Sequence, residues 1–564
     1  MAVGDSKLEV AGSQPEMPRR FSIWSLAALA FTLTSTWQGT ASSIGAGLMA
    51  AGQGGMIWAL SIAGLMTTVV AVGMAELASA YPVSGAQYYW SFMVARDDYK
   101  AFTSYLTAWL TVIGWWFASA AVANFVSSTI LDIIVAWTPD FEPQSWQKYL
   151  IYVCLIWIAA LVNIFLANWI PRYNKMTFAL AIVTLCGTCI TLFTIPRNNH
   201  ATATTIFTKI ENRTGWSSDG FAFMLAVGNS VFAYLGGDCA AKMAEEVPNP
   251  SKTIPLVTLF PPIIGLITAF PFLTSLMYSV TDIDAVLTNT RGLPLFEIYR
   301  QGTQSQIGAS VLLGIFAFFQ FSTLIACANI YEPATTSSRT VWAVARDGVL
   351  PYSQYWEAIH PIATVPYEAR SHIAVDITKH KLTSGTFQVY GLLFLGSSTA
   401  FSAMVSAAII FVQTSIVLPQ AVLLFRGRDQ VLPPRYMNLG KAGVIVNALA
   451  VTWVVFLNVI YCFPTRMPVS GKNMNYVSIV CAGMMAFILL LWFTTKKKTF
   501  AGPTIDIRAL HARRQEAMQT ELTIINAGHT SDSTVVDEES ISEKKDKEEF
   551  GIKISHTAIN RRLS

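Results

Sequence analysis

The chain has 564 residues, of which 53% are hydrophobic and only 13% charged, and its mean hydropathy is +0.45. A soluble domain carries about a quarter charged residues, so this composition indicates an integral membrane protein. The formal net charge is only +4, and we expect no nucleic-acid partner. The sequence has no Walker pattern, no cluster with metal-ligand spacing and no soluble catalytic constellation, which excludes a nucleotide-driven pump. We therefore expect no enzyme activity, no metal site and no cofactor.

Twelve apolar runs follow one another along the chain, and each can supply the roughly 20 residues that cross a bilayer as a helix. They cover residues 21–51, 55–79, 102–131, 149–170, 176–195, 218–241, 255–279, 306–332, 373–396, 399–425, 442–463 and 475–494. Residues 1–20 and 496–564 are polar and lack the apolar content needed to fold alone. The sequence therefore predicts an all-α membrane domain over residues 21–495, between a disordered N-terminus and a disordered C-terminal tail.

Basic residues alternate between the two sides of these spans. Lys and Arg favour short cytoplasmic loops, and they precede span 1 and follow every even-numbered span. They are Arg19, Arg20, Arg96, Lys100, Arg172, Lys175, Lys242, Lys252, Arg339, Arg346, Arg426, Arg428, Arg435, Lys441, Lys496, Lys497 and Lys498. Both termini should thus be cytoplasmic. The loop from Arg197 to Gly215 then faces outside and carries the one glycosylation sequon, at Asn212.

Span 9 is the atypical element, over about residues 367–396. The stretch from Glu368 to Lys381 holds five charged residues, and each charge at the bilayer centre costs roughly 2.5–3.5 kcal/mol. The basic loops on either side nevertheless require two crossings between them. Either span 9 is degenerate, or residues 367–388 are not part of the working protein.

Two apolar runs are interrupted by small residues at equivalent places in two halves of the domain. The first interruption is Ser42–Gly47 in span 1, and the second is Ala233–Asp238 in span 6. A helix in lipid must satisfy its own backbone, so a break is tolerated only around a cavity or a bound solute. Paired interruptions of this kind point to a solute-binding site at mid-membrane depth.

Three motifs, together with Ile44–Leu48, carry a resemblance to a known family. Glu76–Pro82 closes span 2, Ala244–Pro250 follows span 6, and Ala345–Pro351 follows span 8. Over about residues 20–495 the chain resembles the amino acid–polyamine–organocation transporters, in particular fungal amino acid, 4-aminobutyrate (GABA) and choline permeases.

The resemblance implies a fold of two inverted five-helix repeats, spans 1–5 and 6–10, followed by two extra helices. It also implies a secondary active transporter in the plasma membrane that imports an amino acid, GABA or choline by alternating access, usually with protons. The residues leave two other interpretations open, a non-transporting nutrient receptor and an exchanger on an internal membrane. The substrate, the coupling ion and the proton-carrying residue also stay open.

The interruption in span 1 supplies candidates for binding a carboxylate. Free N–H groups at the N-terminus of a half-helix favour anions. We select Ser42, Ser43 and the amides of Gly45, Ala46 and Gly47, although these small residues could instead serve only close helix packing.

Span 6 supplies Phe232, Tyr234, Gly236 and Asp238. An aromatic ring beside unwound backbone can hold an ammonium group, and an acid inside a membrane span is a functional candidate because its burial is costly. Asp238 could bind the substrate amine or the coupling proton. The alternative is a structural ion pair with Lys242, four residues further on.

The remaining candidates lie on spans 2 and 3, in the loops after spans 6 and 8, and in the tail. Trp115 and Asn124 on span 3 could face the cavity, or the tryptophan could be a packing anchor. Glu76 could form an inner gate with Lys252 or Arg346, and the same contacts could be purely structural. The C-terminal tail could be simply a solvated segment, or it could be a partner of the ubiquitin machinery, with Lys544, Lys545 and Lys547 as acceptors.

Overall fold

The computed structural model describes residues 22–138, 140–166, 169–195, 200–288, 294–328, 344–345, 347–350, 391, 398–471 and 474–503, and all of its elements belong to the unit Met1–Ile505. These residues form helices and no strand. In chain order the elements are α2 (Ile23–Thr34), α3 (Thr36–Ser42), α4 (Ile44–Ala80), α5 (Ala86–Val94), α6 (Lys100–Trp137), α7 (Ser145–Phe165), α8 (Ile170–Thr194), α9 (Ala203–Thr208), α10 (Asp219–Val231), η2 (Phe232–Tyr234), η3 (Ala241–Glu246), α11 (Pro250–Ser279), α12 (Ile283–Thr288), α13 (Pro294–Thr303), α14 (Gln306–Ala328), α18 (Ser398–Arg426), α19 (Arg428–Val431), α20 (Ala442–Ile460), α21 (Val477–Leu491), η5 (Trp492–Lys496) and α22 (Lys497–Thr499).

Nine helices in the described part of the chain are long and apolar enough to cross a membrane. They correspond to predicted spans 2–5, 7, 8 and 10–12, which confirms the all-α membrane fold. Spans 1 and 6 do not count among the nine because each is broken into shorter pieces. All of span 9 except Gly391 lies outside the described residues, as do Arg346, residues 1–20 and nearly all of the tail. The total of twelve crossings therefore stays a prediction.

Span 1 is interrupted twice, once at Ser35, outside the predicted stretch, and once at Ser43, inside it. The left-handed residue that ends α2 is Ser35, with φ 40° and ψ 50°, and α3 starts directly after it. In the predicted interruption, Ser42–Gly47, only Ser43 leaves the helical conformation. The glycines of the predicted stretch, Gly45 and Gly47, are helical. The left-handed break at Ser35 involves a hydroxyl group instead. The Ser35 hydroxyl donates to the carbonyl of Thr32, which the broken helix leaves free.

Span 6 is interrupted where the sequence predicts. Helix α10 ends at Val231, the single 3₁₀ turn η2 follows, and the chain then runs through turns to η3. Gly236 has a φ of 110°, a conformation that residues with a side chain rarely adopt. In the described part of the chain, spans 1 and 6 are thus interrupted crossings five spans apart, which fits the implied inverted repeat.

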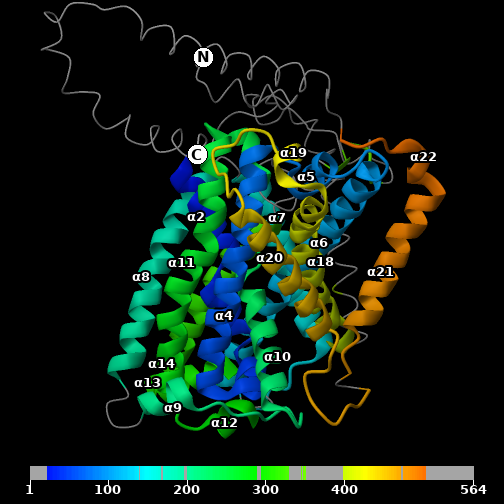
Figure 1. Ribbon diagram of the computed structural model, residues 1–564. Coiled ribbons are helices and arrows are strands. Elements are labelled where there is room, and N and C mark those ends of the chain that lie inside the picture. The colour runs from blue at the N-terminus through cyan, green and yellow to red at the C-terminus, as the bar shows by residue number, and fades with distance from the viewer. Residues whose placement is uncertain are drawn as a thin grey trace, which may run out of the picture. The chain divides into compact units, whose positions relative to one another are not determined.

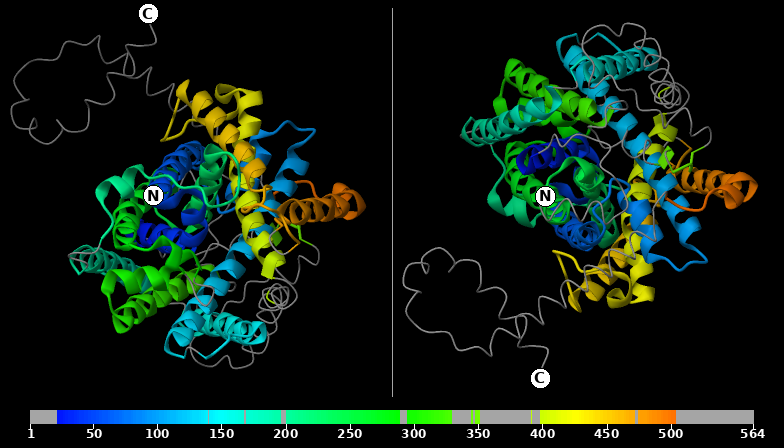
Figure 2. Two further views of the ribbon diagram at one scale, coloured as in Figure 1. Left: turned by 90° about the horizontal axis from the view of Figure 1, so that it is seen from below. Right: turned by 90° about the horizontal axis from the view of Figure 1, so that it is seen from above.

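The two interruptions pack directly against each other. A Cβ atom on Gly39 of α3 would lie 2.7 Å from the Cα atom of Ala233, and one on Gly236 would lie 3.4 Å from the backbone of Leu33 and Thr34. Asn229 adds a polar link, because its side chain donates to the carbonyl of Ser43 at 3.1 Å. Figure 2 shows the blue ribbon of spans 1 and 2 beside the green ribbon of spans 6 and 7.

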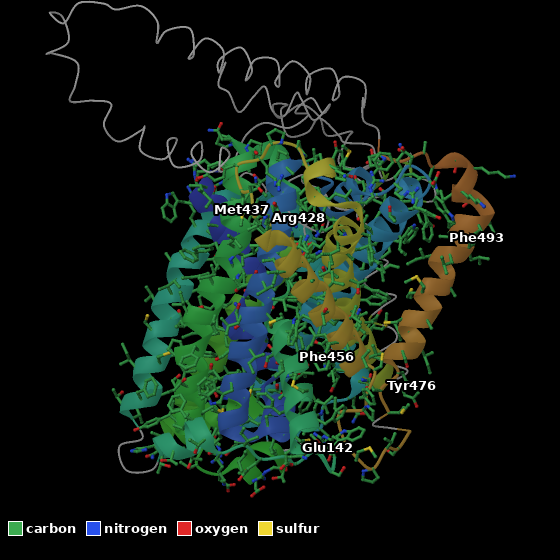
Figure 3. The ribbon with its side chains drawn as sticks, viewed as in Figure 1. Glu142, Arg428, Met437, Phe456, Tyr476 and Phe493 are labelled. Atoms are coloured by element: carbon green, nitrogen blue, oxygen red, sulfur yellow. The ribbon has the colours of Figure 1, made fainter. Side chains whose placement is uncertain are left out.

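The last two spans present apolar side chains outward. Ile445 on α20, and Ile479 and Leu490 on α21, are each more than 60% exposed, and Phe493 on η5 points away from the other helices (Figure 3). Lipid tails would cover such side chains. Helices α5, α19 and α22 lie at one end of the spans and α9 and α12 at the other (Figure 1).

Replacing Gly39 by Ala tests the contact between the interruptions. The added methyl group meets the backbone of Ala233, so we expect the free energy of unfolding to fall by about 1–3 kcal/mol. The measurement is the thermal unfolding midpoint of the purified protein in detergent. Gly314→Ala on α14 is the matched control, because nothing lies within 4 Å of a Cβ atom there. Equal midpoints for the two variants would contradict the close packing.

Candidate functional site

A cavity of about 60 Å³ lies between the two interruptions and helices α6 and α14. That volume exceeds the ~10–15 Å³ that a single water needs. The lining residues are Leu33, Thr34, Ser35, Gln38, Gly39, Ser42, Trp115, Ala118, Val122, Phe125, Phe232, Leu235, Gln320, Thr323 and Cys327. Every one of these described lining residues is uncharged. Three were predicted from the sequence: Ser42, Trp115 and Phe232.

Hydroxyl and amide groups form one wall of the cavity. The hydroxyls of Ser35 and Thr323 lie 3.0 Å apart, and the Thr323 hydroxyl also lies 3.2 Å from Oε1 of Gln38. This group ties the break in span 1 to α14. The hydroxyl of Thr34 is buried and has no hydrogen-bond partner among the described residues, so it can serve a solute.

A second polar chain runs from α6 through α14 to α3. The Thr129 hydroxyl donates to Oε1 of Gln320 at 2.8 Å, and Nε2 of Gln320 donates to the Ser42 hydroxyl at 2.8 Å. The amide orientation of Gln320 is therefore fixed at both ends. Because the Ser42 oxygen acts as the acceptor in this bond, its own hydrogen remains available to donate, including to a solute in the cavity.

Aromatic rings form the facing wall. The rings of Phe125 and Phe232 meet edge to face, with centroids 5.5 Å apart at 62°. Trp115 completes this side of the cavity from α6. Ring faces attract cations without carrying a charge of their own. The arrangement can hold a small polar or cationic solute between aromatic faces and hydroxyl groups.

Asp238 lies outside the cavity lining and forms an ion pair. Its Oδ2 atom lies 2.8 Å from Nζ of Lys242, and both side chains are at most 1% exposed. Nε2 of Gln87 and Nε1 of Trp115 donate to the same oxygen at 2.7 and 3.1 Å. These contacts match the structural alternative given by the sequence, in which Asp238 forms an ion pair with Lys242.

The other candidates on the interruptions do not line this cavity. Tyr234 is buried and donates to the carbonyl of Leu60 on α4 at 3.1 Å. Gly236 lies against the backbone of span 1, and a Cβ atom on Gly45 would meet the ring of Pro294. Asn124 lies on α6 and its carbonyl accepts bonds from two serine hydroxyls. The rest of the span 1 set, Ser43, Ala46 and Gly47, lies at the start of α4.

Sequence reasoning missed most of the polar lining. Thr34, Ser35, Gln38, Gln320 and Thr323 were not selected, because an uncharged polar residue in an apolar span usually has a packing role. One signal was available: three adjacent hydroxyl residues, 34–36, interrupt the apolar run of span 1. Such residues can satisfy backbone groups that a broken helix releases.

Glu76 is buried at the end of α4, and among the described residues it pairs with two arginines that were not predicted. Arg428 forms an ion pair with Glu76 Oε2, and Arg435 donates to Oε1 through Nη2 at 2.6 Å and through Nε at 2.8 Å. The three side chains are at most 6% exposed. Lys252 instead lies over the ring of Tyr436, 5.4 Å from its centroid.

The segment from Arg428 to Gly440 is fastened to the ends of α4 and α11. The amide of Leu439 donates to Glu76, and the amide of Met437 donates to the hydroxyl of Ser79 at 3.0 Å. Ser79 and Ser251 in turn exchange hydrogen bonds, each hydroxyl donating to the other's carbonyl at 3.0 and 2.7 Å. Arg428 and Met437 are labelled in this region of Figure 3.

Asn212 is half-buried at the opposite end of the spans. Its side-chain amide donates to the carbonyl of Trp216 at 2.7 Å and to Asp219 at 3.1 Å. Its oxygen accepts from the backbone and the hydroxyl of Thr214. A glycan on this nitrogen would leave one N–H, enough for one of the two donated bonds.

Comparisons with known proteins agree with this geometry. The family described as "Amino acid permease" matches residues 21–487. The chain is 30% identical over 497 residues to the choline transporter of Saccharomyces cerevisiae, covering 88% of this chain and 85% of that protein. It is 29% identical to amino-acid permease 2 of Neurospora crassa, over 89% of each chain. It is 28% identical to amino-acid permease BAT1 of Arabidopsis thaliana, over 90% of this chain and 97% of that one.

Replacing Glu76 by Gln tests the buried ion cluster. The change leaves two buried arginines without their carboxylate, so we expect a loss of about 3–5 kcal/mol in the free energy of unfolding. Thermal unfolding in detergent is the measurement. The control is Asp97→Asn, which removes an ion pair whose acid is 93% exposed and should leave the midpoint unchanged. A Glu76 variant as stable as this control would show that the cluster is not structural.

Proposed function

We propose that this chain, which belongs to the amino acid permease family, imports a small amine-bearing solute by alternating access. The chain is an integral membrane transporter and not an enzyme. The observation that carries the proposal is the uncharged cavity between the two interrupted spans. Solute sites of secondary transporters form at such interruptions.

The substrate we propose is an amino acid, GABA or choline. Its ammonium group would lie against the rings of Trp115, Phe125 and Phe232, and a hydroxyl or carboxylate would accept bonds from Thr34 or Ser42. Relatives named as a choline transporter and as amino-acid permeases support this range.

We assign the predicted substrate-site residues to three groups and the gating candidates to a fourth. Ser42, Trp115 and Phe232 would contact the solute, whereas Tyr234, Gly236 and Asp238 would shape the site from behind. The residues Ser43, Gly45, Ala46, Gly47 and Asn124 would reach a solute only in another conformation of the cycle. As a gate, Glu76 would act through Arg428 and Arg435, with Lys252 beside it.

We further propose proton symport in the plasma membrane, with both termini in the cytoplasm. The sidedness is supported by the positions of two elements with basic residues, α19 and α22, at one end of the spans, and of α9, which precedes the Asn212 sequon, at the other (Figure 1). A receptor would bind the solute without accumulating it. An exchanger on an internal membrane would show uptake stimulated by preloaded solute.

Radiolabelled uptake in a permease-deficient yeast tests the transport proposal. We expect accumulation of choline, GABA or one amino acid against its gradient, faster at acidic than at neutral pH and abolished by a protonophore. Phe232→Ala should lower uptake about tenfold or more, because it removes a cavity wall. Phe493→Ala, at a 66% exposed position on the outside, should leave uptake unchanged.

Surface abundance of each variant is measured in parallel. Binding without accumulation would replace the transporter with a receptor, and equal uptake by the two phenylalanine variants would remove the cavity from the mechanism.

Glycosylation of Asn212 tests the sidedness. Treatment with an N-glycosidase should increase the gel mobility of the unmodified protein, because the sequon faces the lumen during synthesis. Asn212→Gln should already run at the faster position, whereas Thr214→Ser keeps the sequon and should keep the shift. A protein that reaches the surface but shows no shift would count against glycosylation of this loop.

A further inference from the structure

A buried ion pair lies directly behind one wall of the cavity. Asp238 and Lys242 are 0% and 1% exposed, and a turn region followed by the start of η3 separates them rather than a regular helix. Oδ2 of Asp238 takes all three contacts, from Lys242, Gln87 and Trp115. Its Oδ1 atom has no hydrogen-bond partner among the described residues. The carboxylate therefore depends on Lys242 for its charge balance.

Trp115 connects this pair to the cavity. Its indole N–H donates to Asp238, Nζ of Lys242 lies 4.6 Å from the centroid of its ring, and the same side chain lines the cavity. Asp238 thus contacts the edge of the Trp115 indole, and Lys242 contacts its face. The indole of Trp115 therefore contacts both the ion pair and the cavity.

The net charge of the pair matters because the surroundings are apolar. A charge that is not screened by water acts strongly over short distances, and a neutral pair cancels most of that field. With both partners present, the cavity has aromatic and hydroxyl walls and a neutral ionic group behind them. With only one present, a full negative or positive charge would lie behind the Trp115 wall.

We propose that Lys242 is a specificity-determining residue of this transporter. It neutralises Asp238 and fixes Trp115, so that the site selects a solute by shape, hydrogen bonds and ring faces rather than by pairing its ammonium with an acid. This inference rests on the function proposed above, since it concerns selection by the same cavity. It gives Asp238 an indirect role, through Lys242 and Trp115, in place of direct contact with the substrate amine.

The test compares solutes that differ mainly in charge. Purified protein is titrated with choline and glycine betaine, and with lysine and norleucine. The cation preference is the dissociation constant of the zwitterion divided by that of the cation in each pair. Lys242→Gln should raise this preference about tenfold, and Asp238→Asn should lower it about tenfold, because each leaves one uncompensated charge near the cavity.

Two further variants separate charge from structure. The double variant D238N/K242Q restores neutrality, so its cation preference should return to within about twofold of the unmodified protein. Lys242→Arg keeps the charge and should behave likewise. Lys441→Gln, at an exposed lysine far along the chain, is the control and should change nothing. A merely structural pair would change stability without shifts of opposite sign in preference.

The outcomes are distinct. Opposite shifts in the single variants with recovery in the double variant support the inference. An unchanged cation preference in folded Lys242→Gln and Asp238→Asn protein overturns it. If Lys242→Gln does not fold, Asp238→Asn decides alone, since its predicted shift has the opposite sign. An unmodified protein that binds neither pair overturns the proposed substrate class, and the inference with it.

Discussion

The hydrocarbon layer of a membrane offers no water to a broken helix, and this constraint determines how spans 1 and 6 must be arranged. Each interruption frees backbone groups that something else must satisfy or cover. The Ser35 hydroxyl donates within its own turn, the Asn229 side chain donates to the carbonyl of Ser43, and Gly39 and Gly236 let the two breaks touch. Each break therefore helps to cover the backbone of the other. The cavity is the space that remains beside the contact, where α6 and α14 complete the walls.

Buried charged groups must also find partners inside the protein, and this chain supplies them in two different ways. Glu76 is compensated by two arginines from a segment more than 350 residues further along the chain, and Asp238 by a lysine four residues away. The first arrangement fastens a loop to the ends of two spans. The second stays within one interrupted span and reaches the cavity through a tryptophan. Buried charges of this kind are costly to separate, so both groups constrain where their segments can go.

The sequence was most informative where a local pattern determines the structure. Apolar run length located the spans, and the glycine pair in span 6 located its interruption, because each depends on a few adjacent residues. The sequence was not informative where residues far apart in the chain compete for the same partner. Glu76 had several basic loops within reach, and only the folded chain selects Arg428 and Arg435. The prediction for span 1 relied on glycines and overlooked the hydroxyl groups around Ser35. The Ser35 hydroxyl donates to the backbone carbonyl of Thr32 at that break. Gln320 and Thr323 could not be chosen without knowing which face of α14 meets α3.

The paired hydrogen bonds between Ser79 and Ser251 have a mechanical consequence. Two hydroxyls that each grip the other's carbonyl form a closed ring of contacts, which resists both sliding and rotation. The adjoining ends of α4 and α11 are therefore linked on both sides of the contact. A rearrangement that moved one of these helix ends without the other would break both hydrogen bonds, so motion of the two ends together is favoured.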